Sequence, residues 1–120
     1  DLKTAWLYTM PQKPQNPVLT LYFDGNAIVT HFGIAIGYQK SVDDAFGDRF
    51  RIFKKPKIVT LETKDGFKQK IKLENIRGMQ YPNIQAMETS ELKVYLDEVY
   101  DGENEDFAIS EIRLLGMELP

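Results

Sequence analysis

Glu111 is the residue whose neighbours in the sequence most clearly predict a bound partner or cation. If the segment around it is a strand, alternation places Glu111 on the same face as Ile109, Arg113 and Leu115. Burial of a carboxylate costs free energy unless the charge is paired or bound to a metal. The pattern therefore predicts a partner for Glu111, which can be an arginine or lysine, a group of backbone N–H donors, or a cation.

The beginning of the chain offers oxygen ligands that could share a cation with Glu111. Asp1 carries a carboxylate and Thr4 a hydroxyl, and calcium binds such oxygens on constrained loops. Chain termini often lie close together in a domain. We therefore expect a structural calcium held by Asp1, Thr4 and Glu111 if the ends meet; otherwise Glu111 pairs with a basic side chain or emerges at a strand edge.

Aromatic and planar polar residues between the strand-like segments predict a carbohydrate-binding surface. Sugar recognition combines an exposed aromatic ring with a few placed polar groups. Each aromatic has the alternative role of closing the edge of the core. The wider set includes Tyr81 and Asn83, and the candidate ligand-binding residues are Tyr8, Tyr38, Gln39, Phe46, Arg49, Tyr100 and Asn104.

Few residues suit catalysis. The chain has one histidine, His31, and no cysteine, so neither a two-histidine nor a thiolate metal site can form. Gly33 and Gly37 lie in a strand-like run, where they favour close packing or a bulge over a phosphate loop. Acid pairs such as Asp43-Asp44 would need a defined separation to act as a glycoside hydrolase. We therefore expect a noncatalytic protein, with a glycoside hydrolase as the less favoured alternative.

Strands must position these residues. Alternating segments predict an antiparallel all-β sandwich or barrel without crossover helices. Asp65-Gly66 predicts a two-residue hairpin in which both central residues have positive φ, and a turn is expected at residues 24–26. The segments predicted as strands cover residues 18–23, 28–38, 57–64, 67–74, 91–99 and 107–115.

Composition limits the function classes. A length of 120 residues, 42% of them hydrophobic and 28% charged, fits one globular domain over residues 1–120. The net charge of −3 combines a basic block at residues 49–77 with an acidic block at 88–118, which we interpret as complementary faces of neighbouring strands. Nucleic acid is a disfavoured partner, and no apolar run is long enough for a membrane span.

Two motifs at the ends of the chain resemble discoidin-like modules of the galactose-binding fold. Asp1-Leu2-Lys3-Thr4-Ala5-Trp6 looks like the second half of their D-G-D-x-x-T-A-W loop. Ile109-Ser110-Glu111-Ile112 looks like their closing strand. The opening strand and first Asp-Gly of the pattern do not appear in this sequence.

Internal motifs resemble a narrower branch, the bacterial domain associated with NAD-glycohydrolase translocation and described as glycan-binding. Residues 32–40 followed by 48–51 match G-I-x-I-x-N-G-Y-x-K and N-N-R-V-K, with Ile36 and Gly47-Asp48 at the asparagine positions. Residues 99–102 followed by 106–111 match V-Y-x-G and D-D-T-x-I-S-E-I.

This resemblance implies an eight-stranded, jelly-roll-like β-sandwich that serves in targeting or adhesion without catalysis. By position it assigns a structural calcium to Asp1, Thr4 and Glu111. It predicts a domain of a longer bacterial protein that is secreted or held in the cell envelope, with a glycan or a surface protein as partner. The alternative is a protein-interaction or structural module that packs on its parent chain. An exposed aromatic cleft would favour glycan binding, and an apolar patch rimmed by charge would favour a protein partner.

Overall fold

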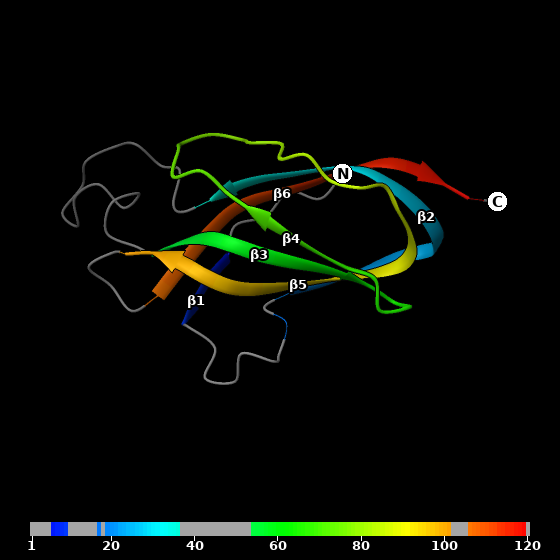
Figure 1. Ribbon diagram of the computed structural model, residues 1–120, viewed down its shortest axis with the longest axis horizontal. Helices are drawn as coiled ribbons and strands as arrows, with labels where there is room; N and C mark the ends of the chain where they lie inside the picture. Colours follow the sequence, from blue (N-terminus) through cyan, green and yellow to red (C-terminus); the bar gives the residue numbers. More distant parts are fainter. Residues whose placement is uncertain (1–5, 10–16, 18, 37–53, 102–105, 120) are drawn as a thin grey trace.

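The computed structural model describes residues 6–9, 17, 19–36, 54–101 and 106–119. Those residues contain strands and no helix, and accordingly no helix among them is long and apolar enough to cross a membrane. The predicted all-β class is confirmed. The strands are β1 (Trp6–Thr9), β2 (Leu19–Ile36), β3 (Lys55–Thr63), β4 (Lys68–Lys72), β5 (Met87–Tyr100) and β6 (Asp106–Glu118) (Figure 1).

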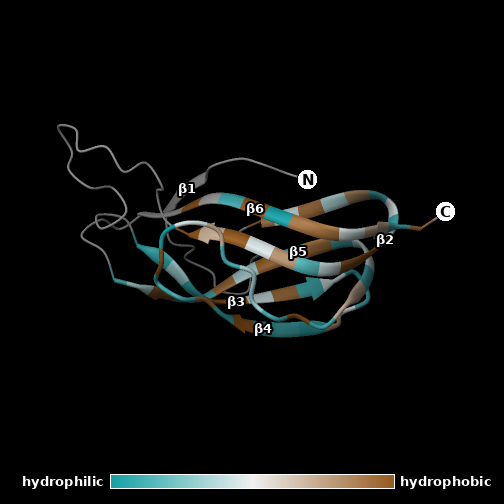
Figure 2. Ribbon diagram, turned by 90° about the horizontal axis from the view of Figure 1, so that it is seen from above, coloured by the Kyte–Doolittle hydropathy of each residue, from teal (hydrophilic) through white to brown (hydrophobic). Residues whose placement is uncertain are grey.

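The six strands form one antiparallel sheet in the order β1-β6-β2-β5-β3-β4, which folds over on itself. The long strand β2 belongs to both halves. Its first part pairs with β5, and its second part pairs with β6. Seen from above, β6 lies on one side of the molecule and β3 and β4 lie on the other (Figure 2). The result is a β-sandwich whose two layers are joined through β2.

The bend in β2 lies where the sequence predicts a turn. Tyr22 pairs with Glu91 and Ala27 pairs with Thr89, so the four residues 23–26 stand opposite Ser90 alone. This insertion is a large bulge, and bulges bend and twist a strand. The chain does not reverse here. The prediction of two strands separated by a turn is therefore wrong, and one continuous strand of 18 residues replaces them.

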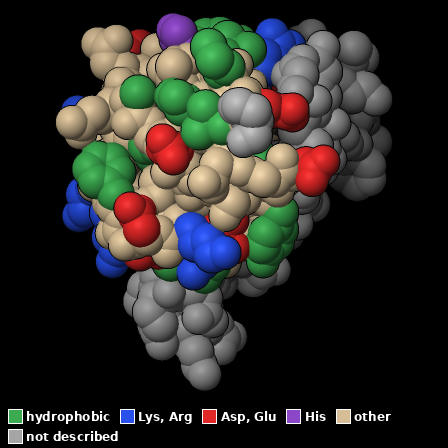
Figure 3. Space-filling view, turned by 90° about the vertical axis from the view of Figure 1, so that its right-hand side faces the viewer, with side chains coloured by type: hydrophobic (Ala, Val, Ile, Leu, Met, Phe, Trp, Pro, Cys, Tyr) green, Lys and Arg blue, Asp and Glu red, His purple; other side chains and the backbone are tan. Residues whose placement is uncertain are grey.

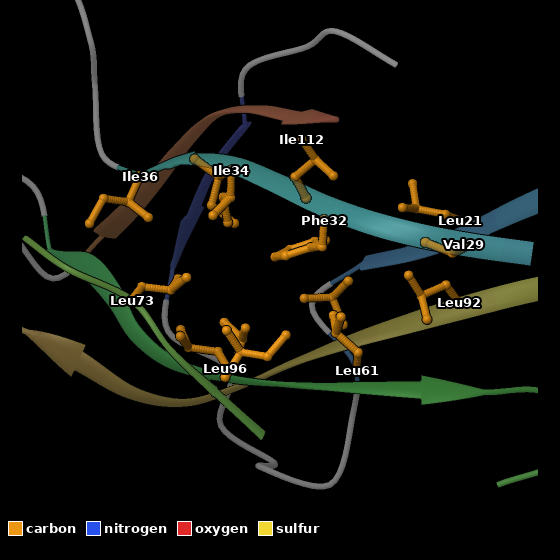
Figure 4. Packing of buried hydrophobic residues seen from close by; sticks show 14 of the residues in the cluster. Leu21, Val29, Phe32, Ile34, Ile36, Leu61, Leu73, Leu92, Leu96 and Ile112 are labelled. Atoms are coloured by element: carbon orange, nitrogen blue, oxygen red, sulfur yellow. The ribbon is translucent and has the colours of Figure 1, made fainter. Parts of the chain in front are cut away.

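The core fills the space between the layers. Phe32, Ile34 and Ile36 of β2 are fully buried and point toward Leu61 and Leu96 of the facing layer (Figure 4). Alternation along β2 places these three residues on one face. The other strands alternate in the same way: the buried residues include Val59, Leu61, Ile71, Leu92, Val94 and Leu96, while Lys68, Lys70 and Lys72 are exposed.

The β3–β4 hairpin forms at Asp65-Gly66, as predicted, but its loop is of another type. Thr63 N–H donates to the Phe67 carbonyl at 2.9 Å, and Gly66 N–H donates to the Thr63 carbonyl at 3.1 Å. Gly66 has φ +95°, whereas Asp65 does not have a positive φ. The loop therefore contains three residues, with glycine in the left-handed position. The Asp65 carboxylate accepts from Thr63 Oγ1, and this bond lowers the pKa of Asp65.

Gly66→Ala should destabilise the domain by about 1 kcal/mol, because a Cβ is disfavoured at this φ. A Cβ there meets no atom within 4 Å, so the cost is conformational rather than steric. Gly66→Asn should cost less, since asparagine tolerates the left-handed region. Chemical denaturation measures both. Equal stability of Gly66→Ala and the unchanged chain would contradict the assigned loop.

Candidate functional site

A bulge at Ser110 changes the face on which Glu111 lies. Ile36 pairs with Ile109 and the preceding residue, Ala35, pairs with Glu111, so Ser110 is an extra residue in β6. Both Ile109 and Ile112 are buried in the core cluster, although strict alternation would separate them. Because Ile112 points inward, its neighbour Glu111 lies on the outer face. The prediction that Glu111 shares the face of Ile109 is wrong.

Arg113 is the partner of Glu111 that the sequence pattern predicts. Its Nε and Nη2 donate to Glu111 Oε2 at 3.0 and 2.5 Å. The two side chains are 29% and 23% exposed, so the pair is partly shielded from water. The hydrogen bonds that Arg113 donates to Glu111, and then the one that it donates to Tyr81, raise the pKa of Arg113 above its usual value. Arginine is therefore held as a fixed cation against the carboxylate.

Tyr81 completes this group on the outer face of the β2–β6 layer. Arg113 Nη1 donates to the Tyr81 hydroxyl at 3.3 Å. A Cβ built on Gly33, the cross-strand partner of Arg113, would lie 2.4 Å from Tyr81 Cε2. The tyrosine ring thus occupies the space that a side chain at position 33 would fill. Tyr81 nevertheless remains 44% exposed.

A strap formed by residues 74–86 carries Tyr81 to this position. Gln80 exchanges two backbone hydrogen bonds with Ile34, at 2.9 and 3.0 Å, along the edge of β2 opposite β6. The Gln80 side chain also holds the backbone of Glu74 through two bonds of 2.8 Å. Gln69 binds the backbone of Gln85 in the same two-bond manner, at 2.9 Å each. These contacts fix the strap on both sides of Tyr81.

We name Gly33, Tyr81, Glu111 and Arg113 the Tyr81 shelf. It presents an exposed aromatic ring beside an ion pair that is held in place from two strands and the strap. Sequence reasoning included Tyr81 only in a wider set and assigned no ligand role to Arg113. The signal available was the pairing of Arg113 with Glu111, two residues apart, but Tyr81 is 32 positions from Arg113, and no local pattern joins them.

Two of the predicted ligand-binding residues, Tyr8 and Tyr100, lie in described strands. Tyr8 pairs with Phe107 of β6, and Tyr100 pairs with Lys55 of β3. The Tyr100 hydroxyl donates to the Leu73 carbonyl at 2.7 Å, and Lys57 Nζ lies 5.5 Å from the ring centroid. Tyr38, Gln39, Phe46, Arg49 and Asn104 lie outside the described residues.

The calcium prediction rests on Glu111 alone within the described residues, because Asp1 and Thr4 lie outside them. Glu111 Oε2 already accepts two bonds from a guanidinium, whose positive charge opposes a nearby cation. One carboxylate is far fewer ligands than the six to eight oxygens that calcium takes. The residues described here therefore do not by themselves make a calcium site.

Thermal unfolding in millimolar calcium and in excess chelator tests this prediction. An ion that binds only the folded chain raises the melting temperature by mass action, and a Glu111→Gln variant should lose that rise if Glu111 is a ligand. Equal melting temperatures in calcium and chelator would remove calcium from the account. Magnesium at the same concentration controls for ionic strength.

No curated protein and no solved structure significantly matches the chain. A family model, the NAD glycohydrolase translocation F5/8 type C domain, matches residues 1–115. This match covers nearly the whole sequence and agrees with the β-sandwich described above. The chain therefore belongs to the NAD glycohydrolase translocation F5/8 type C domain family, whose members are discoidin-like.

Proposed function

We propose that this domain is a noncatalytic module that attaches an exported bacterial protein to a surface glycan, and that the glycan binds at the Tyr81 shelf. The family is associated with translocation, a task for which attachment to a surface is useful. The observation that carries the proposal is the exposed Tyr81 ring seated on Gly33 beside the Glu111–Arg113 pair.

The ring suits a sugar because it is both exposed and positioned in advance. One side of Tyr81 lies against Gly33, and its hydroxyl is held by Arg113. A side chain that is already ordered loses little freedom on binding, whereas ordering a mobile one costs about 0.5–1.5 kcal/mol. The C–H face of a pyranose can then pack on the exposed side of the ring.

The polar neighbours suit hydroxyl groups better than charged ones. Arg113 and Glu111 neutralise each other, so the shelf carries no net charge from this pair. Both hydrogen bonds from Arg113 to Glu111 end on Oε2, and a sugar hydroxyl could donate to Oε1. A neutral sugar with a hydroxyl beside its apolar face fits this arrangement.

A glycan array tests the proposal. The unchanged domain should bind a defined subset of sugars, and Tyr81→Ala should weaken that signal about tenfold, the upper range for loss of one aromatic contact. Phe67→Ala is the matched control, since Phe67 is 40% exposed, is aromatic and lies away from the shelf. Silence across a broad array, or equal loss in both variants, would contradict the proposal.

A further inference from the structure

A second surface lies at the end of the sandwich where β2 bends. It is an open hollow of about 590 Å³ between the first half of β2 and the last part of β6. Its lining includes residues 19–23, 27–29 and 114–118. We name it the β2–β6 slot. Figure 3 views the molecule from this end and shows hydrophobic side chains interspersed with acidic and basic ones.

Large apolar side chains beside the slot are unusually exposed. Tyr22 is 76% exposed, Met117 65% and Leu115 45%. Single exposed apolar residues are common, but a group that shares one hollow marks an interaction surface. Leu19, Phe23 and Leu114, which also line the slot, pack against the core. The apolar lining of the slot therefore extends from exposed side chains to side chains that pack against the core.

Strand edges border the slot. Five consecutive residues of β2 and five of β6 line it, and consecutive residues of a strand point to opposite faces. Because residues from both faces of each strand line the hollow, we infer that an edge of each strand, and not one face, borders it. Within the ranges that the structure describes, residues 19–22 form a ladder with β5 only. An edge of this kind accepts an added strand from another chain.

The charges around the slot specify its occupant. Among the described residues that line the hollow, Glu118 carries the charge, and Asp24 lies in the bend between the lining residues Phe23 and Ala27. On β5, across the ladder, Glu91 and Glu88 stand opposite Tyr22 and Ile28, and Lys93 stands opposite Thr20. Glu118 and Asp24 form an acidic rim, and complementary charge steers a basic partner to it.

We propose that the β2–β6 slot binds an extended segment of a partner protein in which apolar and basic residues alternate, and that the segment adds as a strand to the free edge of β2. The apolar residues enter the hollow and the basic residues meet the acidic rim. This site is separate from the Tyr81 shelf, so each proposal can fail without the other.

Fluorescence polarisation with four labelled nine-residue peptides tests the inference. A peptide of alternating valine and lysine should bind saturably, and one of alternating valine and glutamate should not. Two further valine–lysine peptides are N-methylated, each along one of the two edges of the strand, and cannot donate hydrogen bonds from that edge. The peptide methylated on the edge that pairs with β2 should lose binding, and the other should keep it. Equal binding of the acidic peptide, equal binding of both N-methylated forms, or no binding of the basic peptide would overturn the inference.

Two charge reversals locate the peptide. Glu118→Lys should weaken binding about fivefold, the upper range for one exposed ion pair. Glu98→Lys is the control, because Glu98 is exposed on β5 opposite Ile58, away from the slot. Circular dichroism confirms that both variants fold. If Glu98→Lys weakened binding as much as Glu118→Lys, the peptide would not bind in the slot.

Discussion

Gly116→Ala is expected to destabilise the domain by about 3 kcal/mol, the upper part of the range for overpacking. A Cβ at this position would lie 1.9 Å from the Ile28 carbonyl oxygen and 3.0 Å from Val29 Cα. Both are backbone atoms of the paired strand, so no side chain can turn aside. Gly116 is exposed, and exposed substitutions usually change stability by less than about 0.5 kcal/mol, which makes a large effect here diagnostic.

Denaturant titration of Gly116→Ala measures this effect, with Gly66→Ala as the matched control. Gly66 has a positive φ but open space around it, so it reports conformational strain without a collision. The Gly116 variant should unfold at clearly lower denaturant than the Gly66 variant. If the two variants were equally stable, the close approach of β2 and β6 at residues 28 and 116 would be wrong.

Gly33→Ala should weaken glycan binding about tenfold while leaving most of the stability. The new Cβ would collide with Tyr81 Cε2 at 2.4 Å and with Met79 Cε at 2.9 Å. These are ends of side chains on the surface strap, and they can move away at low cost. The collision displaces the ring from its seat, and we expect about a tenfold loss of affinity, comparable to deleting the aromatic contact.

Titration with the sugar selected on the array, together with a thermal melt, separates the two effects of Gly33→Ala. The affinity should fall strongly and the melting temperature only slightly. Gly116→Ala provides the opposite pattern, a large loss of stability caused by backbone contact. Full glycan affinity in Gly33→Ala would show that the position of Tyr81 on Gly33 does not matter for binding.

The two Asp-Gly pairs show what a local pattern can and cannot predict. The sequence predicts a turn at each pair, and both glycines have a positive φ, +85° at Gly25 and +95° at Gly66. At Gly66 the chain reverses, whereas at Gly25 it continues as β2. The difference depends on which strand lies alongside, because β5 pairs with β2 on both sides of the bend. That pairing is a property of the tertiary structure.

The alternation of apolar and polar residues predicted the strands and most of the core. It assigned the wrong face to Glu111, because a bulge shifts the alternation by one residue. One extra residue, Ser110, moves Glu111 to the outer face, and a one-residue shift of register exchanges every side chain beyond it. In the ladder of β3 with β5, Glu62, an acid of the basic block, pairs with Lys93, a base of the acidic block; that the basic residues of one block face the acidic residues of the other stays a prediction. Within the basic hairpin, Lys68 Nζ lies 3.8 Å from Glu62 Oε2.

The shelf could be predicted only in part for the same reason. The sequence identified Glu111 as a carboxylate in need of a partner and Gly33 as a site of close packing. It could not bring Tyr81 to Gly33, because that contact depends on the strap and on the hydrogen bonds between Gln80 and Ile34. The remaining predicted ligand residues stay predictions.

The most direct test of the Tyr81 shelf is a titration of tyrosine-labelled domain with the array-selected sugar, followed by nuclear magnetic resonance of the ring signals. The chain has six tyrosines, each assignable by substitution with phenylalanine. The ring signals of Tyr81 should shift as the sugar binds, while those of Tyr95, whose hydroxyl donates to Glu62 on the other layer, should not. Saturable binding that leaves the Tyr81 signals unmoved would contradict the account.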